Sequence, residues 1–72
     1  MSNFVSTENA KGFNRITLES DEAVGVYVYV WETEASATPE RDYLQDTLAM
    51  AMEFCEEDFG VPLTSWQAFS GG

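Results

Sequence analysis

Alternation of polar and apolar residues predicts a β-hairpin in the first half of the chain. Residues 13–19 interleave polar and apolar positions, which places Ile16 and Leu18 on one side of an extended segment. Residues 24–31, VGVYVYVW, are dense in β-branched and aromatic side chains, which favour a strand. The polar residues between the two stretches suit a tight connection. We therefore predict a hairpin over residues 13–31.

The next pattern has helical spacing, and its end signals place a helix at residues 38–59. Thr38 suits the N-cap and Pro39 the first helical position. Gly60 can take the left-handed conformation that ends a helix. Within these limits one face is apolar and is expected to face the core; it consists of Leu44, Leu48, Ala51, Met52, Cys55 and Phe59.

The remaining segments complete one small α+β domain, residues 1–72. Residues 1–12 are mostly polar and predict a loose lead-in or a short edge strand, whereas residues 63–69 alternate weakly and predict a C-terminal strand before a flexible tail at 70–72. The expected fold is a small antiparallel sheet of three to four strands packed on one amphipathic helix, in the order β-β-α-β. A chain of 72 residues is too short for a second domain.

Composition argues against several classes of function. The chain has 13 Asp and Glu, three Lys and Arg and no His, which gives a formal net charge of −10. Without histidine it lacks the commonest general base and transition-metal ligand. Its acidic clusters lack the spacing of a calcium loop. We expect no catalytic residues, no metal and no cofactor, and too few cations for direct nucleic-acid binding.

The sequence also predicts a compartment. A single cysteine, Cys55, cannot form a disulfide within the chain, and we interpret it as a small buried hydrophobe. The N-terminus has neither the basic start nor the apolar stretch of a secretory signal. The longest apolar run, residues 23–31, is far shorter than the roughly 20 residues that a membrane helix needs. We therefore expect a cytoplasmic protein without a membrane partner.

The predicted helix carries a nearly continuous acidic face opposite its apolar one. This face consists of Asp42, Asp46, Glu53, Glu56 and Glu57. Like charges four residues apart weaken a helix, and acids near its C-terminal end oppose the helix dipole. We interpret the acids as kept for a partner, with a merely solvated surface as the alternative.

Both faces of the strand at residues 24–31 are apolar, and one helix covers only one of them. Valines point to one side, whereas Tyr27, Tyr29 and Trp31 point to the other. An uncovered strip of such aromatics would be a large exposed patch. The second face must be covered by another copy of the chain, by a different protein, or by aromatic residues elsewhere in the sequence: Phe4, Trp66 and Phe69.

These features favour an acidic inhibitor that occupies a basic nucleic-acid-binding surface of its target. Residues four apart on a helix rise ~6 Å, similar to the step between phosphates, so carboxylates in a row can imitate a nucleic-acid backbone. In size, acidity and lack of enzymatic motifs the chain resembles phage-encoded DNA mimics, including small anti-CRISPR proteins. That resemblance implies inhibition through protein–protein binding. The predicted partner-binding residues are the five acids of the helix together with Tyr27, Tyr29 and Trp31.

Two alternatives stay open at this point. The chain could be a non-enzymatic structural or accessory protein, for example a homodimer joined through the aromatic face, with acidity serving solubility. It could also be adapted to high salt, since protein surfaces in such environments are rich in acids and poor in lysine.

Overall fold

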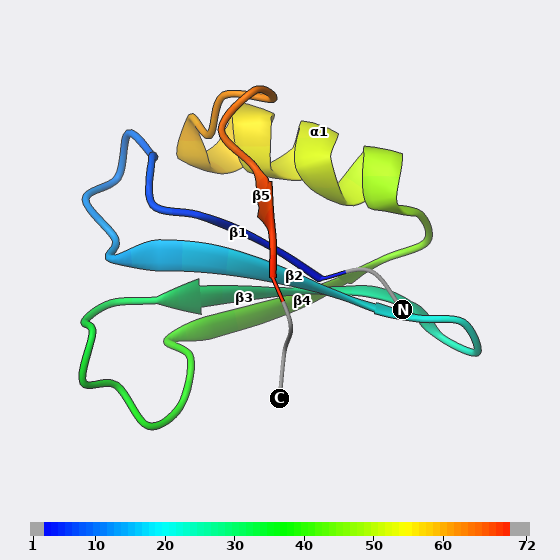
Figure 1. The fold of residues 1–72 in the computed structure, drawn as a ribbon, viewed down its shortest axis with the longest axis horizontal. Coiled ribbons are helices and arrows are strands. Elements are labelled where there is room, and N and C mark those ends of the chain that lie inside the picture. The colour runs from blue at the N-terminus through cyan, green and yellow to red at the C-terminus, as the bar shows by residue number, and fades with distance from the viewer. Residues whose placement is uncertain (1–2, 70–72) are drawn as a thin grey trace.

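The computed structural model describes residues 3–69, and it shows one helix lying on one face of a five-stranded antiparallel sheet (Figure 1). The elements are β1 (Asn3–Ser6), β2 (Arg15–Asp21), β3 (Gly25–Trp31), β4 (Arg41–Gln45), α1 (Leu48–Phe59) and β5 (Gln67–Ala68). Their order across the sheet is β4-β3-β2-β1-β5. The predicted α+β class, with one helix packed on an antiparallel sheet, is confirmed, and the sheet has five strands where three to four were expected.

The predicted hairpin is present as β2 and β3. Their pairing runs from Arg15 opposite Trp31 to Asp21 opposite Gly25. Gly25 has a φ of 135°, and a β-carbon there would collide with the carbonyl of Gln45 at the end of β4. Glycine is therefore required where the turn meets the neighbouring strand.

The prediction of a helix from residue 38 is wrong, because α1 begins at Leu48 and residues 41–45 form β4. Thr47 is the N-cap, and its hydroxyl accepts a hydrogen bond from the Met50 N–H at 3.1 Å. Local signals favour Thr38, because Pro39 and Glu40 follow it, whereas no acid lies in the first turn after Thr47. The free edge of β3 decides between them, since pairing with β4 satisfies backbone groups that an earlier helix would leave exposed.

Because α1 begins at Leu48, three residues that the sequence analysis assigned to the two faces of the helix lie outside it. Leu44 was expected to face the core, but it lies on β4 and is 50% exposed. Asp42 also lies on β4, and Asp46 lies in the connection that precedes α1. The far end of the helix is where the sequence placed it, because Gly60 has a φ of 66° and its N–H donates to the Glu56 carbonyl at 3.1 Å.

The segments before the hairpin and after the helix differ from the prediction in opposite ways. β1 is an interior strand, paired with β2 on one side and β5 on the other, and therefore neither a loose lead-in nor an edge strand. The predicted strand at residues 63–69 is reduced to Gln67–Ala68, because Pro62 starts a turn that Ser65 closes by donating its N–H to the Pro62 carbonyl. The tail predicted at residues 70–72 lies outside the described residues.

The core lies between α1 and the valine side of β3. It consists of Ile16, Leu18, Val26, Val28, Val30, Ala51, Cys55, Phe59 and Val61. Phe4 and Trp66 pack against this same core. Phe69 follows β5, three strand positions away from β3. None of these three aromatics therefore covers the tyrosine side of β3, although the sequence had left that option open.

Cys55 is fully buried in this core, and burial, with a smaller contribution from Asp58, raises the pKa of its thiol to about 12. Alkylation requires the thiolate. We predict that iodoacetamide labels the native chain very slowly at mildly alkaline pH and labels the urea-unfolded chain quickly, as measured by mass spectrometry. Equal labelling of the two states would contradict the buried assignment.

The described part of the chain contains no helix with the length and apolarity that crossing a membrane requires.

Candidate protein-interaction surface

The sheet face turned away from α1 carries most of the candidate chemistry (Figure 1). Residues paired directly across antiparallel strands share a face. The register therefore places Tyr29 between Thr17 and Asp42, and Tyr27 between Glu19 and Leu44. We call the part of this surface that lies on β2, β3 and β4 the open face; it consists of Arg15, Thr17, Glu19, Tyr27, Tyr29, Trp31, Asp42 and Leu44. Among residues 3–69, no helix or further strand packs on it.

Three aromatic rings form a continuous strip along the middle of the open face. The rings of Tyr27 and Tyr29 are stacked, with centroids 5.9 Å apart and an angle of 11° between their planes. Trp31 continues the strip, with its ring centroid 6.5 Å from that of Tyr29. The indole N–H of Trp31 donates to the Thr17 hydroxyl at 2.9 Å. The strip is therefore fixed by its own contacts before any partner binds.

Carboxylates flank this strip on both sides. Glu19 lies on β2 and Asp42 on β4, and both are exposed. The pKa of the Tyr29 phenol is raised by burial first, and then by the negative charges of Glu19, Tyr27 and Asp42. The phenol thus stays protonated and able to donate a hydrogen bond in a negative local field.

Arg15, the basic residue of the open face, makes its contacts within the chain. The guanidinium carbon of Arg15 lies 4.4 Å from the centroid of the Trp31 ring. Its Nη1 atom donates to the Asn14 side-chain oxygen at 3.0 Å and to the Thr33 carbonyl at 3.5 Å. Arg15 therefore stacks on the strip, and among residues 3–69 its hydrogen bonds go to Asn14 and Thr33 and not to Glu19 or Asp42.

We predict that Tyr29 titrates at a higher pH than free tyrosine and that Glu19→Gln lowers its pKa. Removal of the Glu19 charge takes away one cause of the shift, whereas burial and Asp42 remain, so the return toward the ordinary value is partial. The measurement is a pH titration of the Tyr29 ring signals by NMR. Glu22→Gln is the matched control, because it removes the same charge at an exposed residue that does not act on Tyr29. An unchanged pKa in Glu19→Gln would contradict the geometry of the open face.

The remaining predicted site residues lie elsewhere. Glu53, Glu56 and Glu57 are exposed on α1, in the other layer of the molecule. Asp46 lines a hollow of about 320 Å³ at one end of the sheet, together with Asp21 at the end of β2. The single acidic helix face that the sequence predicted is therefore wrong, because two of its five members are not on the helix.

The structure brings Asp42 together with the aromatic strip, and it adds one residue that sequence reasoning missed. Glu19 shares the open face because it pairs with Tyr27 across the hairpin. The signal was available, since the alternation that turns Leu18 toward the core turns Glu19 away from it.

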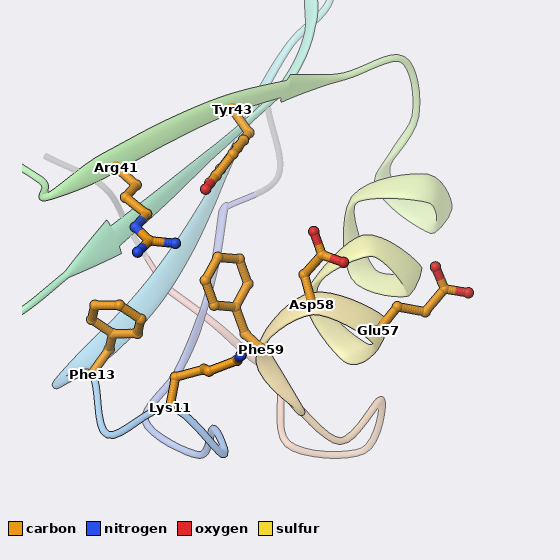
Figure 2. Close-up of a pocket in the computed structure, with 7 residues that line it drawn as sticks. All are labelled: Lys11, Phe13, Arg41, Tyr43, Glu57, Asp58 and Phe59. Carbon is orange, nitrogen blue, oxygen red and sulfur yellow. The ribbon is translucent and has the colours of Figure 1, made fainter.

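A second and larger hollow, of about 600 Å³, lies at the C-terminal end of α1 on the helix side of the sheet (Figure 2). Lys11 and Arg41 line it together with two acids of α1, Glu57 and Asp58. Its other lining residues are the aromatic side chains Phe13, Tyr43 and Phe59. Side chains of both signs line this hollow together with aromatic rings, so it has no dominant sign of charge, in contrast to the open face.

Comparison with models of protein families, with curated proteins and with solved structures finds no match. Within residues 3–69, no group of three or more Cys, Asp or Glu side chains is placed so that it could hold a metal ion.

Proposed function

We propose that this chain is an acidic binding protein that uses its open face to occupy a basic, nucleic-acid-binding surface of a target protein and so inhibits it without catalysis. The observation that supports the proposal is the aromatic strip flanked by exposed Glu19 and Asp42 on a face that no described element covers. Aromatic residues are enriched at the energetic centres of protein interfaces. Carboxylates are the natural partners of the arginines and lysines in a nucleic-acid-binding groove.

The overall charge selects the class of partner. A net charge of −10 repels nucleic acids and attracts basic proteins, and it accelerates the encounter with them. In this proposal the exposed acids of α1, Glu53, Glu56 and Glu57, add to the long-range field, and the open face makes the contact. The site of action is the cytoplasm, where the single thiol of Cys55 is kept reduced.

A second copy of the chain is the competing occupant of the open face. The aromatic strip favours such a dimer, but each copy carries a formal net charge of −10, so the two copies repel each other. Like charges across an interface disfavour binding. Sedimentation at low salt is therefore expected to give a monomer of 8.0 kDa. A stable dimer that masks Tyr29 and Trp31 would support an accessory role for the protein instead.

The function is tested by capture followed by competition. The chain is immobilised and exposed to nucleic-acid-binding proteins that have been purified from a cell extract on heparin. The proposal expects a target that is released by rising salt and by duplex DNA or RNA, and that no longer binds labelled nucleic acid once the chain is in excess. A captured protein that keeps its full nucleic-acid binding in the presence of excess chain would refute the proposal, as would the absence of any salt-sensitive capture.

A further inference from the structure

We propose that the hollow between Glu19, Tyr29, Trp31 and Pro39 receives the guanidinium group of an arginine side chain from the partner protein. This inference rests on the proposed function, because it names the partner chemistry that the open face takes. It goes further by assigning one subsite, with its own ligand and its own test.

The hollow is built from three separate segments of the chain. Glu19 comes from β2, Tyr29 and Trp31 come from β3, and Pro39 comes from the connection that precedes β4. Its volume is about 270 Å³, which is room for one side-chain head group. The planes of the two aromatic rings are inclined at 60°, so a flat group can stack on one ring and touch the other with its edge.

The lining selects a cation. The faces of tryptophan and tyrosine rings attract cations placed within about 6 Å of the ring centroid. Glu19 adds a full negative charge that repels anions and accepts hydrogen bonds from a bound donor. Arginine fits better than lysine, because its planar guanidinium stacks on a ring while its N–H groups reach a carboxylate.

The chain itself provides an example of this contact. The Arg15 guanidinium already stacks on Trp31, with its central carbon 4.4 Å from the ring centroid. Arg15 is not among the residues that line the hollow. Because Arg15 occupies one face of the Trp31 ring, a guanidinium from outside stacks on the Tyr29 ring in the hollow and is bound there by Glu19.

The test is an NMR titration of the full chain with a short capped peptide, acetyl-Gly-Arg-Gly-amide. We expect saturable shifts of the Glu19 amide, the Tyr29 ring signals and the Trp31 indole N–H. The matched peptide with citrulline has the same shape without the charge, and we expect it to bind about tenfold more weakly. The lysine peptide is expected to fall between the two.

Single substitutions test which residues form the arginine subsite. Glu19→Gln is expected to weaken binding of the arginine peptide about threefold, and Glu22→Gln, with the same change of charge, to leave it unchanged. Tyr29→Leu is expected to weaken binding by a similar factor, because it removes one aromatic wall. Equal binding of the arginine and citrulline peptides would overturn the assignment, as would shifts spread over the acids of α1. A single-stranded oligonucleotide that shifts the same signals would also overturn it, in favour of base stacking.

The two proposals can fail separately. Peptide binding at the hollow without capture of any nucleic-acid-binding protein would reject the proposed function and keep the arginine subsite. Inhibition of a captured target without a specific arginine effect at Glu19 would reject the subsite and keep the function.

Discussion

Replacing Phe59 by alanine is expected to destabilise the domain by about 3–5 kcal/mol, the usual cost of removing a buried phenylalanine ring. Phe59 is 2% exposed, and its ring contacts those of Phe13, Phe54 and Tyr43 at centroid distances of 5.9, 5.9 and 6.1 Å. Its carbonyl also accepts the Ala10 N–H at 2.7 Å. The residue therefore joins the helix end, β4 and the segment before β2.

A loss of this size matters because the domain is small. A chain below about 80 residues rarely draws more than about 3–5 kcal/mol from its core, so Phe59→Ala should leave a large unfolded fraction without denaturant. Urea titration followed by far-UV circular dichroism measures the change. Met50→Ala, on the same helix but 47% exposed, is the control and should shift stability by about 0.5 kcal/mol or less. A Phe59→Ala variant with an unchanged urea midpoint would show that the core lies elsewhere.

Reversing the two carboxylates of the open face is expected to weaken target binding about a hundredfold or more. The variant is Glu19→Lys with Asp42→Lys, which turns two attractive charge pairs at the contact into repulsive ones. Close charge pairs at interfaces couple by about 1.5–7 kcal/mol each, and about 1.4 kcal/mol corresponds to a factor of ten. Both residues are exposed, so the fold is expected to survive.

The matched control reverses two acids of α1, Glu53→Lys with Glu57→Lys. Each reversal adds two units of charge, so both double variants change the formal net charge from −10 to −6. The helix pair is expected to cost at most about tenfold, because exposed charges beyond about 8 Å are screened at physiological salt. Binding is measured by calorimetry, with circular dichroism to check folding. Equal losses for the two variants would mean that total charge, and not the open face, controls binding.

The hairpin of β2 and β3 was the most predictable part of the sheet, because alternation of side chains is a local signal. Val26, Val28 and Val30 are buried, and Tyr27 and Tyr29 face the opposite side, as the two-residue period of a strand requires. The C-terminal end of the helix was also predictable, because Gly60 followed by Pro62 stops a helix whatever surrounds it.

The start of the helix was not predictable from local signals. Thr38-Pro39 and Thr47-Leu48 both fit a helix N-terminus. Residues 41–45 form a strand because the edge of β3 is available to pair with them, and that edge is a property of the folded sheet. β1 depends in the same way on the partners that lie on both of its sides.

The error in the helix start changed the candidate site. A helix from residue 38 would have aligned Asp42 with Glu53 and Glu57, whereas the strand aligns Asp42 with Tyr29. The acidic and aromatic features therefore meet on one surface that the sequence had divided between two elements. Glu19, the second acid of the open face, follows from the hairpin register alone.

In the proposed function the open face, and not the helix, contacts the basic partner. The most direct test is NMR mapping of the labelled chain in complex with a captured nucleic-acid-binding protein. We expect the Trp31 indole N–H and the ring signals of Tyr27 and Tyr29 to shift or broaden, while the amide signals of Glu53 and Glu57 stay in place. Changes confined to the outer surface of α1, with the Tyr29 and Trp31 signals unmoved, would contradict it.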